Sequence, residues 1–493
     1  MAISDAEYTA WLNNNNSAYR CVLIEATVKS GGSEVVRYMS NRGYVTSDTD
    51  TPANTTYKAI IKGGVKLTET LSLDSNPTMS FGDIEIENIR GNRDSWLNDI
   101  WENRQIAVYF GDVRWARSDF RLVFAGIMDG LVSRTKSSLN ILVRDTLQRL
   151  NTPVYNTKFT VPPNKDKLYP LCYGECHNVT PVQINSNSPA EYMINAVDVM
   201  DIIEVRDGGV PVSFNKTVSG SKYLGTFSLK VPAVSDVTVD CFGAETTNTI
   251  KNVIVSLVTN FGTTGSSLSI GNIDSTNFTS FDSLYPYPVG LYLTEKENLL
   301  DVCQRVAGSV GAQVAMSRTG LLRLLQINLP ASGTPTSIEK KHIQEGSFSI
   351  DSFTDVKAAI KIGYAKNWTV QNNIQSAIPD NHRTLFATEW FSYTASDGTV
   401  GADYKFATDD DQIDTLLIDP SNANSEANRR LTLLKQKRTI YKMTCFASML
   451  NLELGQAVTL TYDRFGLNGG VSGQVVGLEP DWIEGKVIVK VIV

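Results

Sequence analysis

Three potential metal ligands lie close together in the run Cys172-Tyr-Gly-Glu-Cys176-His177. Two thiols and one imidazole are ligands that zinc or an iron–sulfur centre accepts. The spacing disfavours such a site, because the two cysteines are not separated by two residues and no second cysteine pair lies nearby. We therefore expect a tight turn around Gly174 with side chains packed beneath it. Cys172, Cys176 and His177 remain weak candidates for metal ligands.

Acid–base chemistry has one candidate pair in the same run. Glu175 and His177 could exchange a proton, but we expect their places in a strand to point them to opposite faces. The other histidines, His342 and His382, lie in no metal-ligand or nucleophile motif. No expected strand is followed by a glycine-rich motif of the kind that binds phosphate. The sequence therefore predicts no catalytic residue, no cofactor and no enzymatic activity.

Aromatic residues offer a second kind of site. Five of them gather in one region and could form a sugar-binding platform: Trp96, Trp101, Tyr109, Phe110 and Trp115. Core packing explains them better, because a helix over 94–104, capped by Asp94 or Ser95, would place Trp96, Leu97, Ile100 and Trp101 on one face. We expect this helix to pack its apolar face against a sheet.

Composition and charge are those of an ordinary folded chain. Apolar residues make up 42% of the sequence and charged residues 20%, and the net charge of -7 shows no basic stripe. We do not expect such a chain to bind nucleic acid through its charge. A mildly acidic surface could still line a channel through which DNA passes. The start does not resemble a signal peptide, and no apolar run approaches the ~18 residues of a membrane span. The six cysteines are expected to be reduced and buried.

The elements that position these residues are mostly strands. Short runs of alternating apolar residues, punctuated by glycine turns, indicate a mainly β protein with α+β modules. The exceptions are helices expected near 94–104, 249–258 and 422–437, and a unit at 294–327. In that unit a capping box, Thr294 to Glu297, starts a helix that a hairpin follows. We divide the chain into an N-terminal arm (1–17), a one-helix β-domain (18–155), a β-rich insertion (156–290), a small α/β module (291–345) and a second one-helix β-domain (346–493).

The two one-helix domains contain a weak internal repeat. Phe124-Ala-Gly126-Ile-Met-Asp129 precedes a strand at 139–145, and Val475-Val-Gly477-Leu-Glu-Pro-Asp481 precedes a strand at 486–493. One such match can arise by chance. It gains meaning because both flanking regions show the same pattern of strands with a single helix.

Four segments resemble, in order, the hub proteins of bacteriophage tail tips and baseplates. The first runs from Asp94 through Ile106-Ala-Val-Tyr-Phe-Gly-Asp112 to Phe124-Ala-Gly126 and a strand ending at Asp145. The second is the turn within 168–182. The third is the helix and hairpin of 294–327, and the fourth is the closing meander of 452–493. Each motif alone is degenerate, and their order makes the case. The positions of Cys172, Cys176 and His177 tolerate many residues in that family, so no metal role is implied.

The resemblance implies a fold and an assembly. It implies two tail-tube-like β-barrels, each with one helix, flanking the insertion and the α/β module. Three chains would then form a pseudo-sixfold ring in the virion tail tip, made in the host cytoplasm. The ring would join the tail tube or distal tail ring and the tape measure to a central fibre or spike, and DNA would pass without specific binding. The alternatives are a virion-associated carbohydrate or receptor-binding protein and, least favoured, a peptidoglycan hydrolase.

Overall fold

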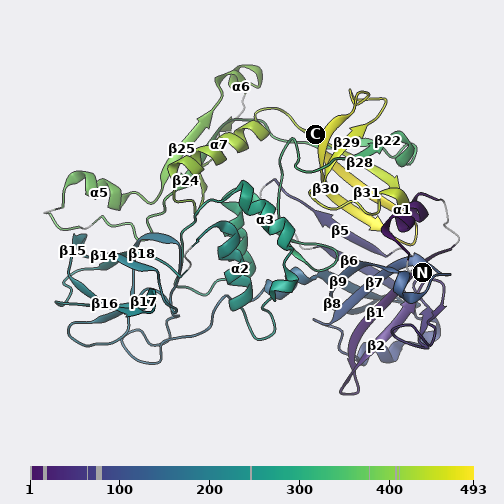
Figure 1. Cartoon of the computed structure of the whole chain (residues 1–493), viewed down its shortest axis with the longest axis horizontal. Helices are drawn as coiled ribbons and strands as arrows, with labels where there is room; N and C mark the ends of the chain where they lie inside the picture. Colours follow the sequence, from purple (N-terminus) through teal and green to yellow (C-terminus); the bar gives the residue numbers. More distant parts are fainter. Residues whose placement is uncertain are drawn as a thin grey trace. The chain divides into compact units, whose positions relative to one another are not determined.

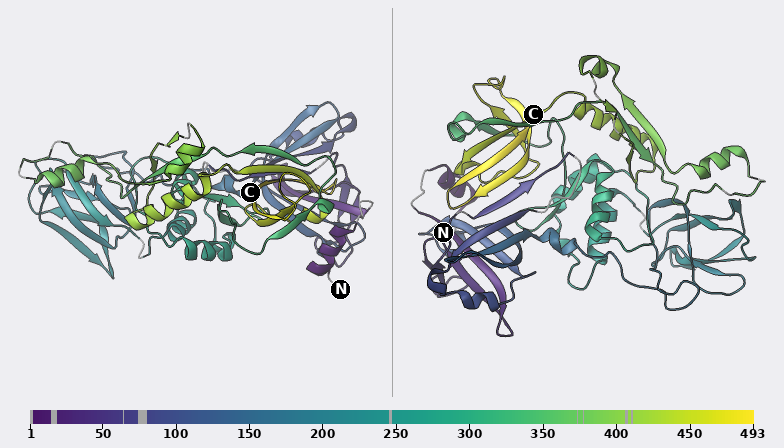
Figure 2. Two further views of the ribbon diagram at one scale, coloured as in Figure 1. Left: turned by 90° about the horizontal axis from the view of Figure 1, so that it is seen from above. Right: turned by 180° about the vertical axis from the view of Figure 1, so that it is seen from behind.

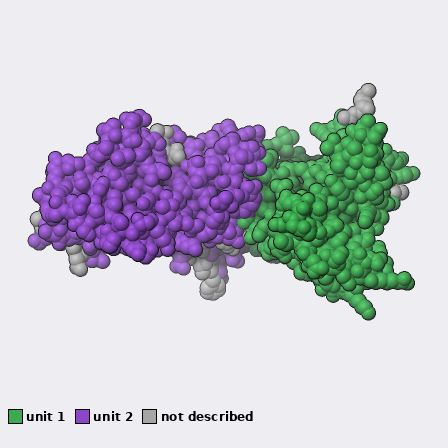
Figure 3. Space-filling view, turned by 90° about the horizontal axis from the view of Figure 1, so that it is seen from below, with its two compact units in different colours: residues 1–148, 314–354, 438–493 green, residues 149–313, 355–437 purple. Residues whose placement is uncertain are grey.

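The structure is a computed structural model that describes residues 3–14, 19–63, 65–73, 80–244, 247–372, 374–376, 378–405, 408–409 and 411–493. The chain forms two compact units, and each is built from segments far apart in sequence. Unit 1 comprises residues 1–148, 314–354 and 438–493, and unit 2 comprises residues 149–313 and 355–437 (Figure 3).

Over its described residues, unit 1 contains one helix, several 3₁₀ turns and most of the long strands. The helical elements are α1 (Asp5–Asn13), η2 (Ile89–Gly91), η3 (Asp94–Asn98), η4 (Arg117–Asp119), η7 (Lys340–His342) and η8 (Ala447–Met449). The strands are β1 (Arg20–Ser30), β2 (Ser33–Ser40), β3 (Tyr44–Val45), β4 (Thr56–Ala59), β5 (Lys66–Thr70), β6 (Phe81–Glu87), β7 (Gln105–Asp112), β8 (Arg121–Thr135), β9 (Ser138–Asp145), β21 (Leu322–Gln326), β22 (Thr336–Glu339), β23 (Ser349–Phe353), β28 (Thr439–Phe446), β29 (Ala457–Thr461), β30 (Val471–Asp481) and β31 (Lys486–Ile492).

The main sheet of unit 1 is continuous. Its order is β23-β28-β31-β30-β5-β6-β9-β8-β7-β1-β2-β4-β3, and β29 pairs with both β30 and β22. Buried side chains from both sequence halves, such as Val22, Ile84 and Val489, share one core cluster. The mainly β prediction is confirmed. The expectation of two separate closed barrels is not met, because over the described strands this path stays open and β5 pairs with β30 across the halves.

Both motifs of the internal repeat lie in antiparallel hairpins of that sheet. β8 pairs antiparallel with β9, and β30 pairs antiparallel with β31. Each pairing contains a register shift, next to Gly130 in the first hairpin and next to Gly477 in the second. The hairpins lie on the two sides of the β5–β6 pair, since β9 contacts β6 and β30 contacts β5. Both repeated motifs thus lie in antiparallel hairpins, but the register shift at Gly130 does not coincide with Gly126, the counterpart of Gly477 in the sequence repeat.

The helix expected over 94–104 is wrong. Only the short 3₁₀ turn η3 forms, and both Leu97 and Ile100 are 48% exposed. The chain becomes extended at Ile100, whose N–H and C=O exchange hydrogen bonds of 2.9 and 3.0 Å with Lys29, so a helix cannot continue. The expectation of core packing nevertheless holds. Trp101 is 1% exposed and Trp96 packs against the same core.

Unit 2 combines small sheets with six helices over its described residues. The helical elements are α2 (Ile250–Asn260), η6 (Ile270–Asn272), α3 (Ser275–Leu284), α4 (Leu299–Gly308), α5 (Asp380–Ala387), α6 (Gly398–Asp403) and α7 (Pro420–Leu434). The strands are β10 (Leu171–Tyr173), β11 (Glu175–Val179), β12 (Val182–Gln183), β13 (Glu191–Met193), β14 (Asp201–Asp207), β15 (Val210–Pro211), β16 (Phe214–Ser219), β17 (Lys222–Leu229), β18 (Val237–Phe242), β19 (Leu291–Leu293), β24 (Lys357–Tyr364), β25 (Phe391–Ser396), β26 (Thr408–Asp409) and β27 (Ile413–Asp414). Turn η5 (Thr146–Leu150) and β20 (Ala312–Met316), which pairs with β21, span the sequence boundaries of the units.

The helix predicted near 422–437 exists as α7, but its expected packing partner is wrong. It lies along β24 and β25 and belongs with them to unit 2 (Figures 1 and 2), whereas the C-terminal strands belong to unit 1. Ala423 and Ala427 are fully buried against Ile360 and Ile362 of β24. Small residues on this face let the helix approach the sheet closely.

The helix and hairpin predicted within 294–327 are confirmed apart from the helix cap. Helix α4 is followed by the β20–β21 hairpin, as the pattern predicts. The N-cap is Asn298, whose side chain accepts hydrogen bonds from the N–H groups of Leu300 and Asp301. The expected capping box at Thr294 lies one turn too early, because the chain between them is not helical.

Candidate functional site

The turn at Gly174 joins β10 to β11 and confirms the expected tight turn. Gly174 has φ of +67°, a conformation that residues with a Cβ rarely adopt. A Cβ there would also overlap the carbonyl oxygen of Val289 and approach the Nδ2 atom of Asn248 to 2.6 Å. The turn thus requires glycine for two independent reasons.

The cysteines of this turn are packed beneath it. Cys172 and Cys176 are at most 1% exposed and join Cys241 of β18 in one apolar cluster. The Sγ atoms of Cys172 and Cys241 are 3.5 Å apart. Burial raises the pKa of the Cys176 thiol, so it stays protonated and is a poor metal ligand or nucleophile. All six cysteines are free and buried, as predicted.

His177 lies on the other face of β11, away from the cysteines. Its Nε2 atom is 3.0 Å from Oε1 of Glu175, and its Nδ1 atom is 3.7 Å from Oδ2 of Asp240. The expectation that Glu175 and His177 point in opposite directions is wrong, because residues two apart in a strand share a face. The hydrogen bond with Asp240 raises the pKa of His177, and burial opposes this effect. The three residues considered as metal ligands are therefore divided between two faces.

Asp240 organises a small ionic network around His177. Arg206 of β14 donates to it from Nη1 at 2.9 Å and from Nη2, and Arg206 also pairs with Glu204 at 2.5 Å. Burial alone would raise the pKa of Asp240, but the hydrogen bonds from Arg206 and His177 outweigh it and hold the pKa well below its usual range. Asp240 is therefore a fixed negative charge.

A cavity of about 190 Å³ opens beside this network. The polar part of its wall comes from β11, β14 and β18, and the apolar part from α5, β25 and the segment between β24 and α5. Its lining residues are His177, Asn178, Arg206, Asp240, Ala365, Asn367, Leu385, Phe386, Thr388 and Phe391. The Arg206 guanidinium lies 5.2 Å from the centre of the Phe386 ring.

Asn178 is the most unusual residue of the cavity wall. It adopts φ of +58° and is only 2% exposed. Its Nδ2 group donates to Oδ1 of Asn367 and to the carbonyl oxygen of Thr369, both at 3.1 Å. Its Oδ1 atom is buried without a hydrogen-bond partner. These contacts fix the orientation of the Asn178 amide, because its Nδ2 group faces hydrogen-bond acceptors. The Oδ1 atom therefore stays without a partner.

Sequence reasoning identified His177 but missed the rest of this site. Asn178, Arg206, Asp240 and Phe386 come from segments that only the fold brings together. One signal was present, because Asp240 interrupts the apolar strand Val237-Thr-Val-Asp-Cys-Phe. A carboxylate inside such a strand needs a partner, which here is Arg206.

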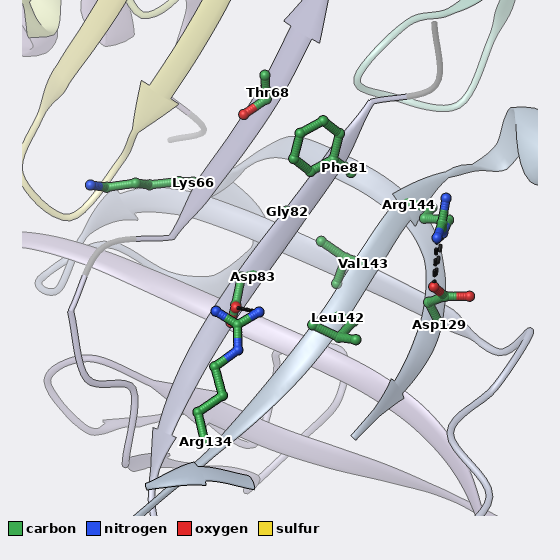
Figure 4. A pocket seen from close by; sticks show the side chains of 10 residues that line it. All are labelled: Lys66, Thr68, Phe81, Gly82, Asp83, Asp129, Arg134, Leu142, Val143 and Arg144. Carbon is green, nitrogen blue, oxygen red and sulfur yellow. Dashed lines mark hydrogen bonds and ion pairs between the residues drawn. The ribbon is translucent and has the colours of Figure 1, made fainter. Parts of the chain in front are cut away.

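Unit 1 has an open groove of about 570 Å³ over β5, β6, β8 and β9 (Figure 4). Phe81, Leu142 and Val143 form its apolar floor, where a Cβ on Gly82 would overlap the carbonyl oxygen of Lys66. Two ion pairs lie at its sides: Arg134 with Asp83 at 2.6 Å, and Arg144 with Asp129 at 2.9 Å. Each arginine of the groove is thus neutralised by a carboxylate.

Two features are absent from the described part of the chain. No group of three or more histidine, cysteine, aspartate or glutamate side chains there is arranged to hold a metal ion. No helix among the same residues has the length and apolar character needed to cross a bilayer.

Comparison with known proteins gives structural similarities only. No protein-family model matches the chain, and no curated protein matches it either. The chain is similar to the 43 kDa tail protein of prophage MuSo2 from Shewanella oneidensis, with 11% identity and a TM-score of 0.43, covering 96% of this chain and 98% of that one. It is similar to the prophage tail protein gp18 from Listeria monocytogenes, with 11% identity and a TM-score of 0.40, covering 95% and 94%.

A third similarity is to a protein of the type VI secretion system from E. coli, described as structurally similar to the T4 bacteriophage tail proteins gp27 and gp5. Identity is 8% and the TM-score 0.35, covering 88% of this chain and 75% of that one. The chain is thus similar, over most of its length, to phage and prophage tail proteins and to a gp27-like component.

Proposed function

We propose that this protein is a structural, non-enzymatic hub of a phage tail tip or baseplate. In this proposal three chains form a ring in the virion, and each contributes two related β-units to a pseudo-sixfold arrangement. The ring joins the tail tube or distal tail ring and the tape measure to a central fibre or spike. DNA passes through it during ejection without specific binding.

The observation that carries this proposal is the pair of hairpins β8–β9 and β30–β31 on the two sides of β5–β6. A chain with two similar units can match a sixfold tube with only three copies. The hairpins come from the first and fourth segments that resemble tail hub proteins. The sequence repeat, the hairpin pairing and the family resemblance thus all concern β8, β9, β30 and β31.

An exposed sheet edge supports assembly with other chains. Among the strands that the structure describes, β23 pairs with β28 alone, and all five of its residues are exposed. Ile350 is 39% exposed and Phe353 49% exposed. An exposed edge with apolar side chains invites pairing with another chain, and closed rings satisfy such edges. In the proposed trimer a neighbouring chain covers β23. This contact closes the sheet, which stays open within one chain.

The charges of the Figure 4 groove suit a surface past which DNA moves. Its two arginines are paired with Asp83 and Asp129 and are therefore poor ligands for phosphate. Unpaired basic residues would hold the DNA backbone in a salt-dependent way. We include this face among those exposed to the DNA path.

Light scattering of the purified full-length chain tests the assembly. The expected molar mass is three times the 54.2 kDa of one chain. Replacing both Ile350 and Phe353 by lysine should shift the mass towards one chain, because two charges oppose edge pairing. The control Val234→Lys, at a side chain 84% exposed in unit 2, should leave the trimer intact. A wild-type monomer or hexamer would contradict the proposal.

A further inference from the structure

Unit 1 repeats one order of four strands. The order is β8-β9-β6-β5 in the first half and β30-β31-β28-β23 in the second, and every neighbouring pair is antiparallel. The register also agrees, as shown by one row of three paired residues in each half: Leu131, Ile141 and Ile84 in the first, and Leu478, Val489 and Met443 in the second. Strand β23 is therefore the counterpart of β5, and β8 is the counterpart of β30.

A second observation aligns β8 with β30. Met128 of β8 makes two backbone hydrogen bonds of 2.8 Å with residues 103–104. Val475 of β30 makes the same two bonds, at 3.0 and 2.8 Å, with residues 455–456. In each strand the register shift against the next strand begins at this residue. This alignment rests on strand pairing and not on the sequence repeat, which matches different residues.

The two strands differ in what pairs with them beyond the register shift. In β30, residues 477–481 pair antiparallel with β5 (Figure 1). In β8, residues 130–135 pair with β9 on one side, and on the other side they have no partner among the described strands. Residues 132–135 of this stretch are exposed, as are all five residues of β23. One chain therefore makes the β5–β30 contact once and presents both sides of a second contact of the same kind.

We propose that β23 of one chain pairs antiparallel with residues 130–135 of β8 in a second copy of the chain, so that the β5–β30 contact is repeated between chains. This inference rests on the proposed trimeric hub and names the two strands that join its copies. Three chains then contain three such contacts within chains and three between chains. A pseudo-sixfold ring requires this alternation, and a head-to-tail contact that closes around one axis leaves no strand edge exposed.

The contact within the chain also specifies the register of the contact between chains. The pairs that join β5 to β30 place Thr68 opposite Glu479. The counterparts of these two residues in the repeated strand order are Ser352 and Val132. We therefore expect Ser352 to lie opposite Val132 of the partner subunit. The pairing also covers the adjacent Phe353, whose side chain is 49% exposed in one chain, and removing this apolar surface from water stabilises the contact.

Disulfide cross-linking of the full-length chain tests this register. Val132→Cys and Ser352→Cys in one chain place two thiols opposite each other across the antiparallel pair, where the Cα atoms are about 4.5–5.5 Å apart and a disulfide can form. Oxidation with copper phenanthroline should give chains linked in threes on a non-reducing gel, because each chain contributes both thiols. Peptide mapping should find the disulfide between residues 132 and 352. The native cysteines do not compete, since all six are buried.

The matched control is Val234→Cys with Ser352→Cys, which keeps the β23 thiol and moves the other to a valine that is 84% exposed in unit 2. It should give no linked trimer. Amide hydrogen exchange gives a second readout on the wild-type chain. In the trimer the amides of β23 and of residues 130–135 should be protected, and both segments should lose this protection when Ile350 and Phe353 are replaced by lysine.

Light scattering of each protein before oxidation separates the failure of this inference from the failure of the hub. A wild-type trimer in which either segment exchanges freely would overturn the strand assignment and leave the hub standing. Thiols at 132 and 352 that stay unlinked in a trimer, that link only into dimers, or that link no better than the control would do the same. A wild-type monomer would overturn both proposals, and its molar mass identifies that outcome.

Discussion

Glu426 of α7 provides the sharpest test of how unit 2 is held together. It is 1% exposed, and its carboxylate meets Nε of Arg429 at 2.8 Å and Nε of Arg430 at 2.5 Å. The same two arginines donate to the carbonyl oxygens of Val310 and Gly308 at the end of α4, at 3.2 and 2.8 Å. The change Glu426→Ala leaves two largely buried cations without their anion.

The loss of folding free energy in Glu426→Ala follows from the burial of this ion pair. Removing one partner of a buried ion pair costs about 3–5 kcal/mol, and the lower end applies here because the arginines retain their carbonyl acceptors. About 3 kcal/mol corresponds to a loss of roughly 6–12 °C in the melting temperature of a body of this size. Burial raises the pKa of Glu426, but both arginines outweigh it and the net pKa is lowered. The stabilisation is therefore present above pH 4.5, the ordinary value, and is lost as pH falls through the lower folded pKa.

Thermal melting combined with hydrogen exchange measures this effect. Exchange in α7 and β24 should accelerate about 100-fold, since every 1.4 kcal/mol is tenfold. The matched control is Glu297→Ala, which breaks an exposed pair with Arg305 in the same unit and should cost less than about 1 kcal/mol. Equal melting temperatures and equal exchange in the two variants would refute the reasoning.

Three further predictions concern the turn, a buried acid and the thiols. Gly174→Ala should destabilise unit 2 by at least about 3 kcal/mol in urea unfolding, whereas Gly220→Ala, with φ of +62° but open space, should cost about 1 kcal/mol. Burial raises the pKa of Asp145 to about 7, so wild-type stability should fall from pH 4 to pH 7 and stay flat in Asp145→Asn, as pH-dependent unfolding will measure. Elemental analysis should find no stoichiometric zinc or iron, and a value near one metal per chain would contradict the account of Cys172, Cys176 and Cys241 as protonated thiols.

Local structure was predictable where one strand or one turn decided it. The alternation in β1 is real, because Val22 and Ile24 face the main core while Cys21 and Leu23 face a second apolar cluster. Gly174 formed the expected turn, and the run 299–327 formed the expected helix and hairpin. In each case the residues that determine the structure are neighbours in sequence.

The predictions that failed concern residues whose structural partners lie far away in the sequence. Ile100 pairs with Lys29, and this pairing stops the helix that Trp96 and Trp101 suggested. Helix α7 was predicted, but the strand that it packs on was not: Ala423 and Ala427 pack against β24. The cavity joins residues 177–178, 206 and 240 to residues 365–391. No local pattern specifies which of these segments meet.

A three-dimensional reconstruction of the tail tip of the particle that contains this chain tests the central claim most directly. The account predicts three copies around the tail axis, each placing β8–β9 and β30–β31 in similar positions around one ring, with β23 covered by a neighbouring chain. One copy, six copies, or copies bound only at the periphery of the tail would contradict it.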